Sequence, residues 1–424
     1  MEAEARDMTR AWVLHPDVAG RENPRPPKRQ LDEALGLAQA LPGLDVVGTT
    51  LVPLPKPRPG HLFGSGKTQE LKALFADNAV ELVLVDGPVT PVQQRNLEKA
   101  WNCKLLDRTS LILEIFSDRA RTKEGVLQVE MAALAYQRTR LVRAWTHLER
   151  QRGALGFVGG PGETQIEADR RAIDDQLIRL RRQLTKVSKT RGLHRASRKK
   201  VPFPVVALVG YTNAGKSTLF NRLTGAKVLA KDMLFATLDP TMRAMELPDG
   251  TDIILSDTVG FISGLPTQLV AAFRATLEEV LDADLVIHVR DISHPESEAE
   301  AEDVKQILGD LGVPQDAAIV EVWNKLDEVP AGERAAVLRK AERSRDVVAL
   351  SALTGEGLDA LAQKIAHQLA PGKQEEVLTL TFGDGRRRAW LFEHTEILAE
   401  EPGEDGLQLR VRWSDRTKAA FCAL

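Results

Sequence analysis

The sequence predicts a mixed α/β protein: an N-terminal α/β domain with a long antiparallel helical hairpin, a Ras-like P-loop domain (G domain), and a small C-terminal α+β domain. Three observations predict this class. Short apolar runs alternate with helical stretches up to about residue 117, leucines recur every seven residues from 127, and a strand, a glycine-rich turn and a helix follow one another at 205–224. A chain of 424 residues is too long for one ordinary core. We expect segments at 1–117, 118–198, 199–371 and 375–424.

Composition indicates a globular protein of the cytoplasm. Hydrophobic residues make up 43% and charged residues 28%, and the net charge of −3 is too small to indicate a nucleic-acid or membrane partner. Cys103 and Cys422 lie far apart, so they offer neither a disulfide framework nor metal-ligand spacing. The polar N-terminus is unlike a signal peptide, and no apolar run approaches the roughly 20 residues of a membrane span. We expect a cytoplasmic protein whose only membrane association would be peripheral.

The first segment alternates strands with helices. Its strands are predicted at "AWVLH", "LDVVGTT", "VELVLVD" and "CKLLD", with helical stretches at 30–41, 68–77 and 91–101 between them. This order is typical of a mainly parallel sheet. The stretch "LVPLPKPRPGHLFGSG" is rich in proline and glycine, and we expect an extended loop there.

Two heptad patterns predict the helical hairpin. The first has leucines at 127, 134, 141 and 148, and the second has apolar residues at 166, 173, 177, 180, 184 and 187. The glycine-rich stretch 151–165 separates them and forms the predicted tip. Between residues 170 and 200 there are twelve Lys or Arg and two acids. Such a concentration favours contact with an RNA backbone, while a rigid strut with a solvated basic face is the structural alternative.

Two stretches contain a Gly-Lys-Ser/Thr string, and only one has the spacing of a phosphate-binding loop. That loop requires a glycine, four residues, then Gly-Lys-Ser/Thr. "GHLFGSGKTQ" (60–69) fails because His61 stands where the first glycine is needed, and prolines rather than a strand precede it. We expect a loop opening the helix at 68–77, with Lys67 a candidate RNA contact. "GYTNAGKSTL" (210–219) has the spacing, with an apolar strand before it and a helix after it.

The chemistry of a nucleotide triphosphate site follows from this second loop. Lys216 would reach the β- and γ-phosphates, and the Ser217 hydroxyl would ligate Mg²⁺. In "SDTVG", Asp257 would hold the ion through water and the Gly260 amide would contact the γ-phosphate. In "NKLD", Asn324 and Asp327 can read a guanine edge, which predicts GTP over ATP. "ALSALTGEG" (349–357) then places Ser351 and Ala352 behind the base.

The stretch before "DTVG" predicts a switch loop and a β-hairpin. "MRAMELPDGTDIILSD" reads as two strands joined by a turn, and "LFATLDPT" precedes it. We expect Thr237 to supply a Mg²⁺ ligand, with Thr241 as the alternative. Phe261 stands where Ras-type enzymes carry the glutamine that orients water, so turnover of the isolated protein should be slow. Asn213 resembles the asparagine that ligates an activating K⁺ in cation-activated GTPases, and the alternative is that it only caps the loop.

The candidate site therefore has three sets of residues. The catalytic set is Lys216, Thr237, Gly260 and Asn213, and the metal ligands are Ser217, Thr237 and Asp257. The nucleotide-binding set is Gly210, Tyr211, Thr212, Asn213, Ala214, Gly215, Lys216, Ser217, Thr218, Phe235, Ala236, Thr237, Leu238, Asp239, Asp257, Thr258, Val259, Gly260, Asn324, Lys325, Leu326, Asp327, Ser351, Ala352 and Leu353.

With these residues placed, the chain resembles HflX-type GTPases, of the TRAFAC class and the Obg-HflX superfamily. The P-loop domain strings "GYTNAGKSTLFNRLTG", "LFATLDPT", "DTVGFI" and "NKLD" are similar to that family. More specific are "DRTSLILEIFSDRARTKEGVLQVEMAALAYQRTRL" and "GGPGETQIEADRR", which lie outside any GTPase consensus. The resemblance covers residues 10–370, and the tail 375–424 is less distinctive.

The resemblance implies a function and partners. HflX-type proteins bind the large (50S) ribosomal subunit and split ribosomes in stress or stalling. By resemblance, the tip 151–165 enters the peptidyl-transferase region and the stretch 170–200 meets ribosomal RNA. Large-subunit assembly or rRNA remodelling is the alternative function, and a GTP-switched protein scaffold is a third. We expect a monomer, with Mg²⁺ as cofactor and K⁺ as an activating cation.

Overall fold

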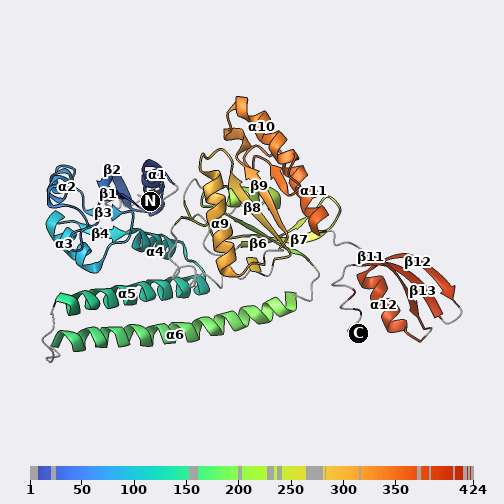
Figure 1. The fold of residues 1–424 in the computed structure, drawn as a ribbon. Coiled ribbons are helices and arrows are strands. Elements are labelled where there is room, and N and C mark those ends of the chain that lie inside the picture. Colours follow the sequence, from blue (N-terminus) through green and yellow to red (C-terminus); the bar gives the residue numbers. More distant parts are fainter. Residues whose placement is uncertain are drawn as a thin grey trace, which may run out of the picture. The chain divides into compact units, whose positions relative to one another are not determined.

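The structure, a computed structural model, describes most of the chain (Figure 1). The described residues are 8–20, 25–151, 161–198, 203–226, 234–235, 241–263, 280–281, 283–314, 317–369, 374–381, 383–403, 406–413, 418 and 421. Side chains at 142–151, 161–166, 188–198, 374, 386 and 396 are not described. The chain divides into two compact units, Met1–Met245 with Asp252–Leu358, and Glu246–Thr251 with Asp359–Leu424. Among the described residues, no helix is long and apolar enough to cross a membrane.

The N-terminal domain is a four-stranded parallel sheet between helices. The strand order is β2-β1-β3-β4, and the elements are β1 (Thr9–Val18), α1 (Pro27–Ala40), β2 (Leu44–Leu54), α2 (Ser65–Asp77), β3 (Leu82–Val85), α3 (Pro91–Trp101), β4 (Lys104–Asp107) and α4 (Arg108–Arg119). Alternate side chains of β1 enter different cores: Ala11 and Val13 pack in one cluster, and Trp12 and Leu14 in the other. The period of two along the strand thus fills both faces of the sheet.

Helix α2 begins earlier than the sequence indicated. We expected Gly66 and Lys67 in a loop, but they lie in the first turn of α2. The Lys67 ammonium pairs with the Glu70 carboxylate at 2.6 Å, one turn further along the helix. This string therefore forms the start of a helix.

Two long helices follow and lie side by side, α5 (Lys123–Gln151) and α6 (Pro161–Arg198) (Figure 1). The Arg138 guanidinium pairs with Asp174 at 2.8 Å, and Leu127 and Leu177 are buried. Helix α5 is attached to the sheet domain through Asp107, because Tyr136 donates a hydrogen bond to this carboxylate and Arg140 pairs with it at 3.0 Å. Gln151 and residues 161–165, expected in the tip, are helical, and the rest of the tip (152–160) lies outside the described residues.

The P-loop domain is built on a six-stranded sheet of order β10-β9-β8-β5-β7-β6. Its elements are β5 (Val205–Gly210), α7 (Lys216–Thr224), β6 (Thr241–Glu246), β7 (Asp252–Asp257), β8 (Leu285–Asp291), α9 (Ser297–Leu311), β9 (Ile319–Asn324), η1 (Leu326–Glu328), α10 (Ala331–Glu342) and β10 (Val347–Ala349). Strand β5 pairs parallel with β7 and β8, and β9 pairs parallel with β8 and β10. The expected mixed α/β class with a parallel sheet in this domain is confirmed.

The second unit carries a small antiparallel sheet. After α11 (Leu358–Leu369) come β11 (Gln374–Leu380), α12 (Gly385–His394), β12 (Glu396–Gly403) and β13 (Gly406–Trp413), with strand order β11-β13-β12. Its core is made of Leu380, Leu391, Leu409, Val411, Trp413 and Phe421.

Candidate nucleotide site

The phosphate-binding loop has the backbone that its two glycines allow. Gly210 ends β5 with φ 152°, and a Cβ there would lie 2.1 Å from the carbonyl oxygen of Val289. Gly215 precedes α7 with φ 89°, and a Cβ there would lie 2.2 Å from the Asn324 side chain. A side chain at either position would clash, and only glycine adopts these backbone angles readily. The loop therefore leads directly from the carboxyl end of β5 into the N-terminus of α7, where free amides attract phosphate.

Lys216 is folded back over this loop. Its ammonium donates hydrogen bonds to the carbonyl oxygens of Gly210 at 3.1 Å and Tyr211 at 2.8 Å. Burial lowers the pKa of Lys216 to about 8, and the nearby Asp257 carboxylate opposes this shift. A phosphate group beside the ammonium would compensate its charge far better than two neutral carbonyls do.

The two expected magnesium ligands that the structure describes lie together. The Ser217 hydroxyl donates to Asp257 Oδ2 at 2.7 Å, and Asp257 is fully buried at the end of β7. Hydroxyl and carboxylate oxygens at a site facing phosphates are the donors that Mg²⁺ prefers. The residues present therefore fit the ion. Thr237, the third expected ligand, lies outside the described residues, as do Ala236, Leu238 and Asp239.

The "DTVG" segment packs directly against the phosphate-binding loop. A Cβ on Gly260 would lie 2.9 Å from the Thr212 side chain and 3.1 Å from the Lys216 ammonium. The next residue is hydrogen-bonded to the loop: the Thr212 amide donates to the Phe261 carbonyl at 2.7 Å, and the Phe261 amide donates to the Gly210 carbonyl at 3.1 Å. Thr258 faces the sheet, since its hydroxyl donates to the Leu208 carbonyl at 2.6 Å.

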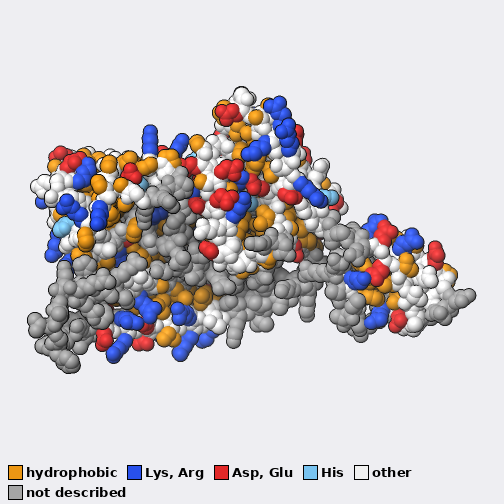
Figure 2. Space-filling view, in the orientation of Figure 1, with side chains coloured by type: hydrophobic (Ala, Val, Ile, Leu, Met, Phe, Trp, Pro, Cys, Tyr) orange, Lys and Arg blue, Asp and Glu red, His pale blue; other side chains and the backbone are white. Residues whose placement is uncertain are grey.

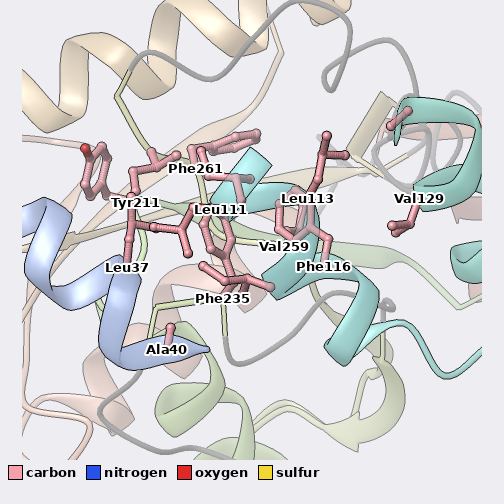
Figure 3. Packing of buried hydrophobic residues seen from close by; sticks show 14 of the residues in the cluster. Leu37, Ala40, Leu111, Leu113, Phe116, Val129, Tyr211, Phe235, Val259 and Phe261 are labelled. Carbon is pink, nitrogen blue, oxygen red and sulfur yellow. The ribbon is translucent and has the colours of Figure 1, made fainter. Parts of the chain in front are cut away.

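Phe261 and Val259 are buried in an apolar cluster that both domains supply (Figure 3). Leu37 of α1 and Leu111 of α4 belong to the same cluster. Phe235, which we expected near the nucleotide, instead packs its ring against Phe116 of α4, with ring centroids 4.7 Å apart. The Phe235 side chain therefore serves the contact between domains.

The base end of the site is closed by Asn324. Its amide group donates to the Ala214 carbonyl at 2.8 Å, and its oxygen accepts from the Ala352 amide at 2.9 Å. Asn324 thus joins the phosphate-binding loop to the loop after β10. Asp327 differs, because its Oδ1 is buried and has no hydrogen-bond partner among the described residues. A buried carboxylate oxygen without a donor is costly, and a guanine ring N–H would supply the donor.

The remaining predicted residues surround this end. Ser351 is fully buried, and its hydroxyl accepts from the Thr354 amide at 3.1 Å. Leu326 is buried. Leu353, in the loop after β10, is 70% exposed. Asn213 is exposed with φ 60° in the phosphate-binding loop. Apart from Phe235, the described residues of the predicted set lie in or directly beside the loops at the carboxyl ends of β5, β7, β9 and β10, where ligands bind in open α/β sheets.

Comparison with known proteins agrees with this geometry. Four family models match consecutive segments: the GTP-binding GTPase N-terminal region at 28–117, the GTP-binding GTPase middle region at 119–198, the 50S ribosome-binding GTPase at 205–325 and the HflX C-terminal domain at 336–421. GTPase HflX of Magnetococcus marinus is 50% identical over 89% of this chain and 86% of its own length. GTPase HflX of Escherichia coli is 44% identical over 84% and 83%. The chain belongs to the HflX family of GTPases. It is a GTP hydrolase built on the P-loop fold.

One feature of this HflX-family chain was not predicted: a buried polar network that joins the phosphate-binding loop to the N-terminal domain. The Tyr211 hydroxyl donates to Glu33 of α1 at 2.7 Å, and accepts from Arg25 at 2.8 Å and from the Ser263 amide at 2.7 Å. Burial raises the pKa of Tyr211, and the Glu33 carboxylate raises it further. The tyrosine side chain therefore points to the N-terminal domain and leaves only its backbone to the nucleotide.

Arg108, the first residue of α4, completes this network. It donates to Glu33 at 3.0 Å, to the Ser263 carbonyl at 2.9 Å and to Asp86 at 2.6 Å. Burial by itself lowers the pKa of Arg108, but the carboxylates of Asp86 and Glu33 more than reverse this effect and raise it. His15 Nδ1 lies 2.7 Å from the other oxygen of Asp86. The one sequence signal for the place of Arg108 is "DRT" directly after a predicted strand. Asp107 in this string caps α4, and Arg108 is therefore the first residue of the helix.

Proposed function

We propose that the GTP-bound chain binds the large ribosomal subunit, splits stalled or stress-inactivated ribosomes, and leaves after hydrolysis. The observation that carries this proposal is the charge on helix α6. Between residues 176 and 187 there are four Lys or Arg and no acid. This local positive charge contrasts with the net charge of −3 for the whole chain. The match of residues 205–325 to a family described as 50S ribosome-binding GTPase supports the same partner.

The basic side chains of α6 are available to an RNA backbone. Arg179, Arg181 and Arg182 are exposed, and Figure 2 shows Lys and Arg along the described part of this helix. Arg181 and Arg182 form no ion pair with a described residue, whereas Arg170 and Arg171 each face an acid one turn away, at 3.9 and 3.6 Å. Phosphate contacts by such free guanidinium groups give strong, salt-dependent binding.

For the nucleotide, we propose the following roles. Lys216 holds the β- and γ-phosphates, Ser217 and Asp257 hold Mg²⁺, and Asp327 accepts the guanine donors. When bound, Mg²⁺ neutralises the phosphate charge that develops during transfer. Thr237 as a further ligand and Asn213 as a K⁺ ligand stay predictions.

Slow turnover in the isolated protein is part of the same proposal. Phe261 is 1% exposed in an apolar cluster and cannot orient a water molecule. A partner surface or a bound cation must therefore supply the missing stabilisation. The ribosome is the expected source.

The test is co-sedimentation in sucrose gradients with a non-hydrolysable GTP analogue. Wild-type protein should migrate with 50S particles and shift 70S ribosomes toward subunits. Exchange of Arg179, Arg181 and Arg182 for Gln should weaken 50S binding by about tenfold or more. The slope of log binding constant against log salt concentration should fall by the equivalent of about three phosphate contacts. Exchange of Arg170 and Arg171, which are already paired, is the matched control and should have a smaller effect. An unchanged ribosome profile at saturating protein would contradict the proposal, and binding only to immature 50S particles would instead favour the assembly function.

A further inference from the structure

We propose that Asp291, the last residue of β8, is a positioning residue for recognition of the guanine base. It acts through Lys325, the second residue of the "NKLD" motif. The Lys325 ammonium lies 2.8 Å from Asp291 Oδ2, and the two side chains are only 18% and 13% exposed. This inference rests on the proposed guanine site and adds a residue outside every sequence motif named above.

Lys325 has a backbone conformation that needs support. Its φ is 64° and its ψ 37°, in the left-handed region, which a residue with a long side chain rarely adopts because its Cβ is crowded there. The turn at Lys325 separates Asn324, which bridges two loops, from Asp327, whose buried Oδ1 has no described partner. A relaxed Lys325 would change the spacing between these two side chains. The ion pair with Asp291 therefore stabilises the conformation that presents Asp327 to the base.

Asp291 is itself held in place on the opposite side. Its Oδ1 accepts hydrogen bonds from the Ser293 amide at 3.0 Å and the Ser293 hydroxyl at 2.5 Å. Strands β8 and β9 end together, since Asp291 is paired with Asn324 and the Ile292 amide donates to the Asn324 carbonyl at 3.0 Å. One carboxylate oxygen thus fixes the loop after β8, and the other fixes the lysine. Because the Asp291–Lys325 pair is largely buried, solvent and salt weaken its attraction less than that of a surface pair.

The decisive variant is Asp291→Asn. The amide oxygen can keep both hydrogen bonds from Ser293, so the substitution removes mainly the closer of the two carboxylate charges that face Lys325. The other is the more exposed Glu328, at 4.0 Å. We expect the dissociation constant for fluorescent GDP to rise about tenfold. Asp291→Glu keeps the charge and should restore affinity to within about threefold of wild type. Glu302→Gln, which breaks an exposed pair with Lys305 at 3.1 Å, is the matched control and should leave GDP affinity unchanged.

A double variant separates positioning from a general loss of stability. If Asp291 acts through Lys325, Asp291→Asn combined with Lys325→Met should bind GDP no more weakly than Lys325→Met alone. Nucleotide-free Asp291→Asn should still unfold in one cooperative transition, with a midpoint no lower than that of Lys325→Met, because both variants lose the same ion pair. Wild-type affinity in Asp291→Asn, or additive losses in the double variant, would overturn this inference while wild-type GDP binding still stood. Failure of the wild-type protein itself to bind GDP would overturn the proposed site together with this inference.

Discussion

The two ends of the nucleotide site are supported by different parts of the molecule. At the phosphate end, Tyr211 and Ser263 are hydrogen-bonded to Glu33 and Arg108 of the N-terminal domain. At the base end, the hydrogen bonds of Asn324 to described residues stay within the P-loop domain, with Ala214, Ala352 and Ile292. From the proposed site we therefore expect selection of the base to be a local property of one domain, and the geometry around the phosphates to depend on contacts between two.

The largest expected effect lies at the base end. Asp327→Asn replaces an acceptor oxygen by a donor group that faces the guanine N–H groups, so we expect GTP affinity to fall about 100-fold and xanthine nucleotides to gain. Competition binding with GDP, XDP and ADP measures both changes. The N-terminal domain makes no contact here among the described residues, so stability should change little. Unchanged preference for guanine would remove Asp327 from the site.

The next effect lies at the phosphate end. Glu33→Gln leaves Arg25 and Arg108 with one carboxylate fewer in a buried network, and we expect the unfolding free energy to fall by about 3 kcal/mol. Nucleotide release should change severalfold, because the amide offers Tyr211 and Ser263 one acceptor oxygen where the carboxylate offers two. The ratio of guanine to adenine affinity should stay within about twofold. Denaturant titration and stopped-flow release check these values, with Glu302→Gln as the surface control. A changed base preference would contradict the separation of the two ends.

The smallest effect at neutral pH concerns His288, which lies in β8 between β5 and β9, the strands that lead to the two ends. Burial lowers the pKa of His288 to about 4, and Glu321 opposes this shift. In the unfolded chain the imidazole titrates near its usual value of about 6.5. Between these values the unfolded state binds a proton that the folded state does not. Stability should therefore be lost as the pH falls from about 6.5 to 4, by up to about tenfold in the unfolding equilibrium constant per pH unit.

His288→Leu should remove the one proton that the unfolded state takes up at this residue, and the unfolding free energy should then fall less steeply with decreasing pH. Denaturation midpoints of both proteins across the same pH range measure the difference. Arg290 and Lys305 also face His288 and lower its pKa, so neither should be changed in the same variant. Parallel curves for the two proteins would show that the imidazole does not remain neutral in the fold.

The sequence allowed prediction of what is local in the chain. Gly210 and Gly215 occupy backbone positions that few other residues accept, so motif spacing alone placed the phosphate-binding loop. The alternation of apolar runs gave the parallel N-terminal sheet. The Glu33–Tyr211 contact could not be foreseen, since it joins residues 178 positions apart and neither has a periodic or motif context that requires the other. The contact of the Phe235 ring with Phe116 of α4 could not be foreseen for the same reason, and the expected place of Phe235 near the nucleotide stays a prediction.

Asp107 and Arg108 are neighbours in the chain, and each is attached to a different part of the protein. Asp107 contacts Tyr136 and Arg140 of the hairpin, while Arg108 contacts Glu33 and Ser263. The two residues lie at the start of α4, where the Asp107 side chain accepts from the Ser110 amide and Arg108 is the first helical residue. Their backbones are therefore held by the same helix. We expect a glycine inserted between them to weaken the link between the hairpin and the segment after "DTVG", because it would add two free backbone dihedrals at this point.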